Sequence, residues 1–385
     1  MSGKILFWCV HLLGIGHLRR AATFAQAMAR AGLDVTLVSG GEPVPNLGAA
    51  PAHFVQLDPV RAVDRFFKIL VDEHGTVIDE AFKKARAGAL LELFQRLQPD
   101  LILTEMFPFG RRQLRFETLP LLEAARARAR PPLIVSSVRD ILVTSPKPER
   151  IEEMVDLLQR YYVAVLIHGD DGLIPFEQTF PPAARVAEKL RYTGYIVDAS
   201  TPRRGPDAPG AGEVIVSAGG GAVSEPLLEA ALAAKPLTPL ADRRWRLLVG
   251  HNLPQEKFDA LRARADAGTV VERARNDFVT LLANSHLSIS QGGYNTVMET
   301  LQFARHSVIV PYAGGLETEQ TLCAKLLAER GLCVVVEEQD LTPHTLAAGV
   351  GRALAMAPID AGHRFKLDGL NESVRIVQAM LAARR

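Results

Sequence analysis

Short apolar runs alternate with amphipathic segments along almost the whole chain. Several runs have the length and the β-branched content of buried strands, among them KILFWCV (4–10), DLILTE (100–105), EVIVSAG (213–219) and HSVIVP (306–311). Between the runs lie segments with helical spacing; in residues 18–31, Phe24 and Met28 share one face and Gly32 is placed to end the helix. This alternation predicts parallel sheets covered by helices on both sides, so the expected fold class is α/β.

The clearest interruption of this pattern is the Pro- and Gly-rich stretch DASTPRRGPDAPGAGE at 198–213. We expect a linker at 201–212 between an N-terminal Rossmann-like domain (1–200) and a C-terminal one (213–365), followed by a C-terminal helix (366–385) that could pack back on the N-terminal domain. Each half opens with a strand that leads into a Gly-rich turn. Two doubly wound domains of this kind would face a ligand across a cleft at the carboxyl ends of their strands.

Composition narrows the function classes. At 385 residues, with 48% hydrophobic and 23% charged residues, the chain is typical of a globular protein of two domains. Its 44 basic and 43 acidic side chains leave a net charge of +1, which gives no global field for nucleic acid. Three cysteines are too few for a disulfide framework or a structural zinc site. The N-terminal apolar run is broken by His11, and no run approaches the roughly 20 apolar residues of a membrane span, so we expect a cytoplasmic protein.

The first Gly-rich turn, GIGHLRR (14–20), carries Gly14 and Gly16. Arg19 stands where the dinucleotide fingerprint needs a third glycine, which argues against NAD. The turn presents His17 at the start of a helix, where an imidazole tends to stay neutral and can accept a proton. The alternative is a histidine that only caps the turn.

Two further Gly-rich turns suit phosphate. In SAGGGAVSE (217–225) a run of glycines opens a helix, namely Gly219, Gly220 and Gly221, and its amides suit a diphosphate or simply form a tight connection. In SISQGGYNTVMETL (288–301), Gly292 and Gly293 end a strand, so the amides of Gly293, Tyr294 and Asn295 point off a helix N-terminus. Glu299 lies about one turn further in and could accept the two hydroxyls of a ribose.

The loop YAGGLETEQ (312–320) follows, with Gly314 and Gly315 before a second helix start. Glu317, Glu319 and Gln320 are acceptors and an amide suited to sugar hydroxyls. The two loops in succession describe a nucleoside diphosphate joined to a polyhydroxylated group, although each alone could be helix capping.

These residues carry a family resemblance. Residues 270–331 resemble the nucleotide-sugar half of GT-B fold glycosyltransferases, with the MurG-like (family 28-like) group the best match, and the first 40 residues or so resemble that group's Gly-rich loop, histidine and first crossover. The resemblance implies that Glu299 holds the donor ribose, that the turn at 292–295 cradles phosphate, and that Gln320 with Glu319 contacts the transferred sugar. It also places the main chain near Arg275 at the uracil edge, with Phe278 nearby, and makes His17 a candidate general base or a group that orients the acceptor.

The chain departs from the family pattern in two places. Gly219 stands where the group has a hydroxyl residue, so that polar contact is lost or moved to Ser217 or Ser224. Glu319 replaces one of a pair of glutamines, which leaves the identity of the sugar open.

The segment TEMFPFGRRQLRFE (104–117) interleaves aromatic and basic residues. If solvent-facing, they could hold an amphipathic or anionic acceptor or touch a membrane surface; the residues concerned are Phe107, Phe109, Arg111 and Arg112. A buried aromatic turn with an arginine salt-bridge network fits equally well. Glu105, at the end of the strand DLILTE, is a second candidate base.

The resemblance implies an inverting glycosyltransferase that works without a metal or other cofactor, with a nucleotide-sugar as co-substrate, most simply a UDP-sugar such as UDP-GlcNAc. The acceptor would be a hydroxyl, lipid-linked if the protein is peripheral to the membrane. The sequence has no Asp-x-Asp or His/Asp cluster with metal-ligand spacing. Alternatives are a UDP-sugar hydrolase or epimerase of the same fold, and a nucleotide-sugar sensor without activity.

Overall fold

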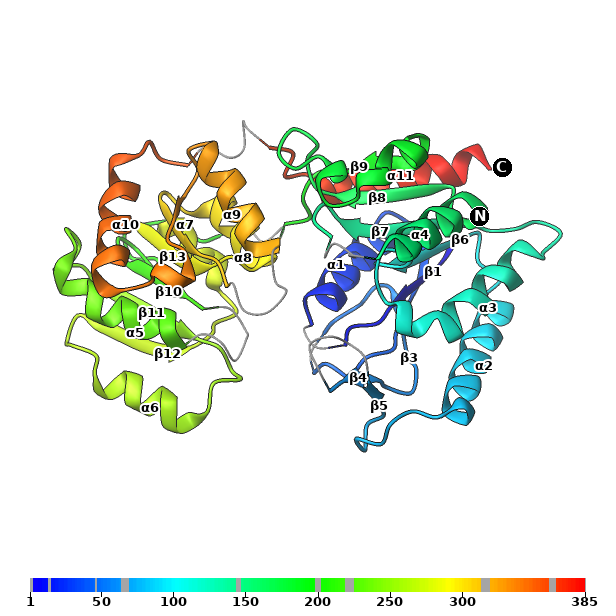
Figure 1. Ribbon diagram of the computed structural model, residues 1–385, viewed down its shortest axis with the longest axis horizontal. Coiled ribbons are helices and arrows are strands. Elements are labelled where there is room, and N and C mark those ends of the chain that lie inside the picture. Colours follow the sequence, from blue (N-terminus) through cyan, green and yellow to red (C-terminus); the bar gives the residue numbers. More distant parts are fainter. Residues whose placement is uncertain are drawn as a thin grey trace. The chain divides into compact units, whose positions relative to one another are not determined.

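The computed structural model describes residues 3–12, 15–45, 47–63, 69–142, 147–197, 202–218, 225–312, 319–359 and 365–384, without the side chain of Glu319. The chain divides into two compact units. The first comprises Met1–Asp171, Pro175–Ile196 and Asp368–Arg385, and the second comprises Gly172–Ile174 and Val197–Leu367. Each unit contains a parallel sheet with helices packed on it (Figure 1).

The first unit is built on a seven-stranded sheet of order β3-β2-β1-β6-β7-β8-β9, in which all neighbouring strands are parallel. The strands are β1 (Lys4–Cys9), β2 (Asp34–Ser39), β3 (His53–Gln56), β6 (Leu101–Glu105), β7 (Leu133–Arg139), β8 (Ala164–His168) and β9 (Leu190–Tyr192). A separate antiparallel hairpin pairs β4 (Arg61–Ala62) with β5 (Leu70–Val71). The order of the main sheet reverses between β1 and β6, and ligands of doubly wound folds bind at the carboxyl ends of the strands at such a point.

Helices cover both faces of this sheet (Figure 1). One face packs against α1 (Gly16–Arg30) and α11 (Gly369–Ala383), the other against α2 (Glu80–Leu97), α3 (Arg115–Arg126) and α4 (Pro148–Tyr161). Phe24 and Met28 are buried on α1 as the spacing predicts, and Gly32, with φ +88°, follows the helix end in a conformation that favours glycine. The last helix, α11, lies in the first unit, because Val374 and Val377 pack in the same core as α1.

The second unit is built on a six-stranded parallel sheet of order β12-β11-β10-β13-β14-β15. The strands are β10 (Val214–Ser217), β11 (Trp245–Val249), β12 (Thr269–Arg273), β13 (Leu287–Gln291), β14 (Ser307–Val310) and β15 (Val334–Val335). The helices are α5 (Glu225–Ala234), α6 (Gln255–Ala263), α7 (Phe278–Asn284), α8 (Tyr294–Phe303), α9 (Glu319–Glu329) and α10 (Pro343–Ala355). The order again reverses next to the first strand, between β10 and β13. The predicted α/β class with two doubly wound domains is confirmed.

The stretch expected to be a linker is largely part of the second unit. Arg204 Nη1 donates to the carbonyl of Ala283 over 2.9 Å, and the amide of Gly205 donates to Asn284 Oδ1 over 3.2 Å, so this stretch packs on the end of α7. A Cβ on Gly210, where φ is +86°, would lie 2.5 Å from the carbonyl oxygen of Leu281. The glycines that suggest a linker by composition therefore serve turns and a close approach to α7.

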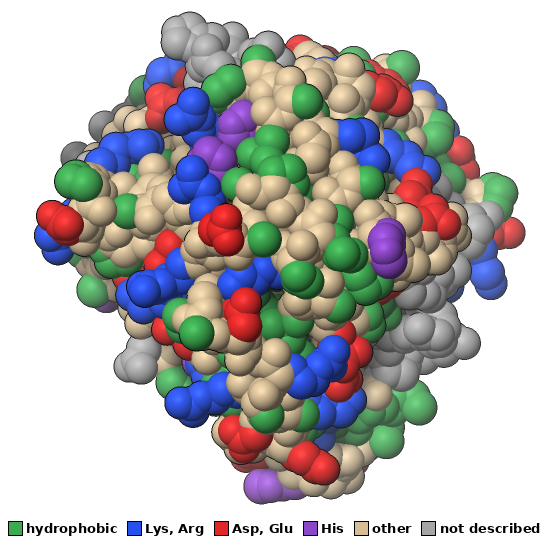
Figure 2. Space-filling view, turned by 90° about the vertical axis from the view of Figure 1, so that its left-hand side faces the viewer, with side chains coloured by type: hydrophobic (Ala, Val, Ile, Leu, Met, Phe, Trp, Pro, Cys, Tyr) green, Lys and Arg blue, Asp and Glu red, His purple; other side chains and the backbone are tan. Residues whose placement is uncertain are grey.

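The balanced charge of the sequence is also visible on the surface. On the side of the molecule shown in Figure 2, Lys and Arg side chains alternate with Asp and Glu over the part that the structure describes. This side of the surface does not concentrate one sign of charge.

Candidate active site

The first site lies at the carboxyl ends of β1 and β6, where the first sheet reverses its strand order. Glu105 is the last residue of β6 and is 1% exposed, and His17 lies in the first turn of α1. His17 Nδ1 is 3.0 Å from Glu105 Oε1, the guanidinium of Arg20 contacts the same oxygen, and Ser137 Oγ donates to Glu105 Oε2 over 2.6 Å. The two residues that the sequence offered as alternative bases thus form one hydrogen-bonded pair.

Burial sets the charge state of this pair. It lowers the pKa of His17 to about 3, opposed by the hydrogen bond to Glu105 and assisted by the nearby Arg139 and Arg111. Burial alone would raise the pKa of Glu105, but Arg20 and the hydrogen bonds from His17 and Ser137 hold it below its usual range. At neutral pH the pair is a carboxylate and a neutral imidazole, so Nδ1–H of His17 donates to Glu105 and Nε2 carries the lone pair. That nitrogen is placed to accept a proton.

Cationic side chains surround the pair. Arg111 donates through Nε to the carbonyl of Val10 over 2.6 Å, and Arg139 Nη2 lies 3.5 Å from His17 Nε2. Arg20, Arg111 and Arg139 bring three guanidinium groups close to Glu105 and His17, and such a group of cations suits an anionic ligand. Gly16 opens α1, and Gly14 lies outside the described residues.

The aromatic segment after β6 faces inward. Phe107 is 1% exposed and Phe109 is 6% exposed, and the Phe109 ring packs edge-on against Phe176 and Phe180 with centroids 5.3 and 5.1 Å away. The reading of these phenylalanines as solvent-facing is therefore wrong: apolar rings that follow a buried strand complete the core beneath it. Arg112 pairs with Glu153 through a 3.1 Å contact, so this segment is the buried turn with an arginine network. Only Arg111 of this segment reaches the site.

The second site lies at the carboxyl end of β13. Gly293 is the N-cap of α8 with φ −63° and ψ 133°, and as a glycine it supplies no side-chain cap to the first amides of the helix. Tyr294 and Asn295 form the first turn, and Glu299 is half-buried further along the same helix. The arrangement has the helix N-terminus that the sequence predicts for a phosphate.

Gln320 connects this turn to the next loop. Its Oε1 accepts from the amide of Tyr312 over 3.1 Å, and its Cβ would lie 3.1 Å from a Cβ built on Gly292. A glycine at 292 therefore lets Gln320 of α9 pack directly on the β13–α8 turn. The neighbouring Gly314, Gly315 and Glu317 lie outside the described residues, as does the side chain of Glu319.

The remaining donor-side residues are split between two segments. Arg275 forms a two-pronged contact with Asp277 at 2.7 and 2.6 Å and reaches Glu272 at 3.4 Å, so its side chain is engaged and only its main chain remains for a base. Phe278 opens α7 and packs on a small core cluster. Ser217 ends β10 and is buried, whereas Gly219, Gly220, Gly221 and Ser224 lie outside the described residues.

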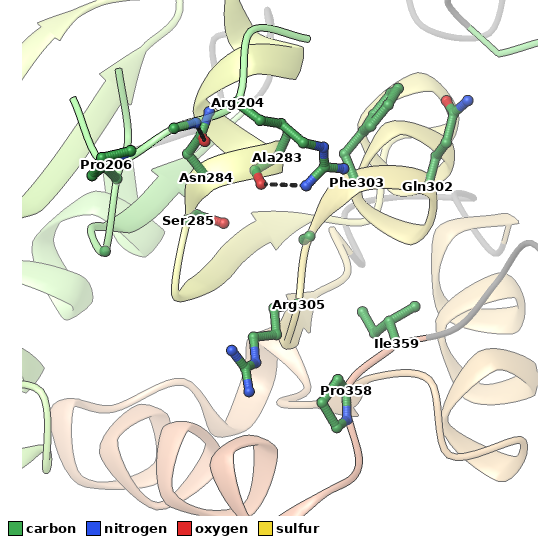
Figure 3. Close-up of a pocket in the computed structure, with 14 residues that line it drawn as sticks. Arg204, Pro206, Ala283, Asn284, Ser285, Gln302, Phe303, Arg305, Pro358 and Ile359 are labelled. Atoms are coloured by element: carbon green, nitrogen blue, oxygen red, sulfur yellow. Dashed lines mark hydrogen bonds between the residues drawn. The ribbon is translucent and has the colours of Figure 1, made fainter. Parts of the chain in front are cut away.

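A cavity of about 630 Å³ lies at the opposite, amino edge of the second sheet (Figure 3). It is lined by the C-terminal ends of α7 and α8 and by residues before and after the sheet, among them Arg204, Asn284, Phe303, Arg305, Pro358 and Ile359. Helix C-termini present carbonyl oxygens and the negative end of the helix dipole, which disfavour a diphosphate. The nucleotide site predicted from the sequence is at the other edge.

Sequence reasoning missed Arg20, Ser137 and Arg139. Arg20 lies one turn after His17, and a pair at this spacing shares a helix face. Ser137 and Arg139 end the apolar strand β7 beside β6. The signal that could have found them is a polar residue at the end of a buried parallel strand.

Among the described residues, no group of three or more His, Cys, Asp or Glu side chains is arranged to hold a metal ion. None of the helices in the described ranges combines the length and the apolar character that crossing a bilayer requires.

Comparison with known proteins extends this picture. Residues 214–361 match the model of the glycosyltransferase family 28 C-terminal domain. The chain is 24% identical over 352 residues to the UDP-N-acetylglucosamine–N-acetylmuramyl-(pentapeptide) pyrophosphoryl-undecaprenol N-acetylglucosamine transferase of Rhodopseudomonas palustris strain BisA53, covering 89% of this chain and 85% of that one. A protein of the same name from Rhizobium johnstonii is 24% identical over 383 residues, covering 96% and 94% of the two chains.

Solved structures agree with this fold. The crystal structure of Acinetobacter baumannii MurG gives a TM-score of 0.62 at 15% identity, covering 98% of this chain and 100% of that one. The calicheamicin glycosyltransferase CalG4 also gives 0.62, at 19% identity, covering 100% and 95%. The two-domain fold is that of the GT-B enzymes, and the protein is a glycosyltransferase. Within that class the chain is MurG-like and carries a family 28 C-terminal domain.

Proposed function

We propose that this protein transfers N-acetylglucosamine from UDP-N-acetylglucosamine to a hydroxyl of a lipid-linked acceptor, with inversion at the anomeric carbon and without a metal ion. The observation that carries the proposal is the buried His17–Glu105 pair at the strand-order reversal of the first sheet, with Nδ1 of His17 3.0 Å from the carboxylate. The donor and the acceptor are those in the names of the relatives.

The chemistry follows from the charge state of the pair. His17 Nε2 accepts the proton of the acceptor hydroxyl as its oxygen forms a bond to the anomeric carbon. The bond from that carbon to the UDP oxygen breaks, and UDP leaves with the electron pair. Glu105 stabilises the imidazolium that forms, since its carboxylate is held in its charged form by Arg20 and Ser137.

The donor is held by the second unit. The start of α8 faces the diphosphate with its amides, and the positive end of the helix stabilises the charge that develops on the leaving group. Glu299 accepts from the ribose hydroxyls, and Gln320 contacts the sugar; Glu319 and the glycines at 219–221, 314 and 315 complete the donor set by resemblance. Because these groups supply the stabilisation, the reaction needs no metal.

The acceptor is held by the first unit. Arg111 and Arg139, next to His17, suit the diphosphate of a lipid-linked sugar. Exposed apolar side chains on and beside the β4–β5 hairpin suit the lipid, since Val63 is 50% and Val77 61% exposed. We therefore place the protein at the inner face of the membrane as a peripheral enzyme.

The first test is isothermal titration of the protein with UDP, TDP and GDP, with Glu299→Ala as the variant. UDP binding in the micromolar range that is lost in Glu299→Ala supports the donor site. No binding of any of the three by the folded protein would overturn the proposal.

The second test is a transfer assay with UDP-N-acetylglucosamine and a polyprenyl-diphosphate-linked sugar, with and without a chelator. Product with the inverted anomeric configuration, formed equally in chelator, supports the full proposal. Release of free sugar at the same rate without acceptor would identify a hydrolase, and binding without turnover would identify a sensor.

A further inference from the structure

Three adjacent strands of the first sheet carry polar side chains near their carboxyl ends, on the same face. On the side of α1 and α11, each of β6, β7 and β8 has two apolar side chains followed by a polar one: Leu101, Leu103, Glu105; Leu133, Val135, Ser137; and Ala164, Leu166, His168. β7 continues on this face to Arg139, which is in register with His168. Glu105 pairs with Ser137 in register, and His168 lies one layer beyond Ser137. The polar side chains at the carboxyl edge are therefore staggered over two layers, with Leu166 beside Ser137 and His168 one step further along.

Glu105, Ser137 and His168 form a continuous row of hydrogen bonds. Ser137 Oγ lies 2.6 Å from Glu105 Oε2 and 2.9 Å from His168 Nε2. His168 Nδ1 lies 3.0 Å from Thr193 Oγ1 and 3.5 Å from Ser373 Oγ of α11. Glu105, Ser137 and His168 are each at most 1% exposed, so the row is sealed from water. In such surroundings every donor and acceptor needs a partner.

Geometry fixes the direction of these bonds. The Glu105 carboxylate only accepts, so the Ser137 hydroxyl donates to it, and the Ser137 oxygen must receive the hydrogen of its next neighbour. His168 Nε2 therefore carries a hydrogen. Burial lowers the pKa of His168 to about 3, so the ring is neutral and its Nδ1 carries the lone pair, 3.0 Å from Thr193 Oγ1. The Thr193 hydroxyl also lies 2.9 Å from the carbonyl oxygen of Gly194, to which it can donate. The bonds from His168 to Ser137 and from Ser137 to Glu105 both point towards Glu105, as does the bond from His17.

We propose that Ser137 and His168 are positioning residues of the His17–Glu105 pair. Their hydrogen bonds hold Oε2 of the Glu105 carboxylate, so that Oε1 receives Nδ1–H of His17. The His17 ring is then oriented with the lone pair of Nε2 towards the acceptor. The proposal rests on the proposed function for the catalytic consequence and on the hydrogen-bond row for the geometry. It predicts two opposite neutral tautomers, Nδ1–H in His17 and Nε2–H in His168.

The chain offers a matched control. Ser136 is the neighbour of Ser137 in β7, is equally buried, and points to the other face, where its hydroxyl donates to the carbonyl of Phe107 over 2.9 Å. Ser136→Ala and Ser137→Ala remove the same atom from the same strand. Ser137→Thr keeps the hydroxyl and suits a strand.

The experiment measures the histidine tautomers by ¹⁵N NMR on ring-labelled full-length protein, and kcat and KM in the transfer assay. We expect Ser137→Ala to shift His168 towards the Nδ1–H tautomer, because Nε2–H loses its acceptor. The same variant should lower kcat about 10- to 100-fold, the effect of losing a hydrogen bond to a charged group, and leave KM for the donor unchanged. Ser136→Ala should leave both tautomers unchanged and kcat within about threefold. Ser137→Thr should restore the wild-type tautomers and most of kcat.

Several results would overturn the proposal: wild-type tautomers in Ser137→Ala, an equal loss of kcat in Ser136→Ala, or a Ser137→Thr variant that behaves like Ser137→Ala. If Ser137→Ala does not fold, the tautomers of wild type and Ser137→Thr decide, since both must show Nε2–H at His168. If the wild type transfers no sugar, the proposed function fails, whereas the tautomers still test whether Ser137 and His168 position the pair.

Discussion

The two sheets share a strand order but differ in how they use polar side chains on buried strands. In the first sheet, Glu105, Ser137 and His168 are joined by hydrogen bonds of 2.6 and 2.9 Å. In the second sheet, three buried serine hydroxyls have no hydrogen-bond partner within the described ranges: those of Ser288, Ser290 and Ser307. The first sheet has one such strand hydroxyl, that of Ser39 at the end of β2. Ser288 pairs with Ser307 in register and shares its face with Ile215, which packs in a cluster with α7.

This difference indicates where the chemistry lies. A polar row that is fully bonded holds one charge and one tautomer, which is what a proton transfer needs. Isolated serines in a buried strand instead act as small residues on which helices pack closely. Under the proposed function, the polar contacts to the donor in the second unit come from the turn of Gly292 and Gly293 and from the side chains of Glu299 and Gln320.

The largest effect is expected from removing the base of the first unit. His17→Ala should lower kcat for transfer by about 10²- to 10⁴-fold, the usual contribution of a general base, and leave UDP affinity unchanged. His53→Ala, an exposed histidine of the same unit with 74% of its side chain accessible, is the matched control and should not change kcat. A loss of less than tenfold in His17→Ala would show that another group takes the proton.

A second large effect is expected when pH is lowered, because burial lowers the pKa of three histidines in the first unit: His11, His17 and His168. Burial lowers the pKa of both His17 and His168 to about 3, so between pH 7 and 5 these rings gain protons only on unfolding. The unfolded state then binds more protons, and the free energy of unfolding falls as pH falls, by about 2 kcal/mol for each of His17 and His168. Glu105 also makes the free energy of unfolding fall with pH, but only below the ordinary pKa of a glutamate. There the unfolded chain takes up a proton that the folded protein, in which the pKa of Glu105 is lowered, does not.

The two tryptophans allow each unit to be measured separately. Trp8 in β1 and Trp245 in β11 are fully buried, one in each unit, so Trp245→Phe reports the first unit and Trp8→Phe the second. Urea unfolding at pH 7 and 5 should show a larger loss in the first unit. Burial also lowers the pKa of His286 and His306 in the second unit, but these rings lie in less buried surroundings. If the free energy of unfolding of the second unit falls by as much or more between pH 7 and pH 5, the lowered pKa values of the histidines in the first unit are contradicted.

Smaller effects are expected from alanine substitutions at two neighbouring glycines of the second unit, one on UDP affinity and the other on stability. A Cβ on Gly293 meets no atom of the described residues within 4 Å, and φ of −63° suits alanine, so Gly293→Ala should fold with unchanged stability. If the diphosphate approaches this main chain, the methyl group should weaken UDP binding by about tenfold, or 1.4 kcal/mol. Gly292→Ala should instead displace Gln320, whose Cβ is 3.1 Å away, and lower the melting temperature. Unchanged UDP affinity in Gly293→Ala would move the phosphate elsewhere.

The hydrophobic periodicity of the sequence predicts most of the helices and strands, but it does not show which strands lie side by side in a sheet. Alternating runs place His17 after β1 and Glu105 at the end of β6, because strand length alone decides which residue comes last. That the two meet depends on β1 and β6 being neighbours at the reversal, and the role of Ser137 depends on the register of β6 with β7. The phenylalanines after β6 show the same limit: local sequence does not decide whether Phe107 and Phe109 face solvent or the rings of Phe176 and Phe180.

The smallest expected effect tests the serines of the second sheet. Ser288→Ala removes a buried hydroxyl that has no partner in the described part of the chain, so the free energy of unfolding, read from Trp245 fluorescence, should stay within about 0.5 kcal/mol of wild type or rise. Ser285→Ala is the control in the same unit: its hydroxyl donates to the carbonyl of Leu282 over 2.8 Å, and its loss should cost about 1 kcal/mol. If Ser288→Ala costs as much as Ser285→Ala, the Ser288 hydroxyl is hydrogen-bonded, and the contrast between a bonded polar row in the first sheet and isolated serines in the second no longer holds.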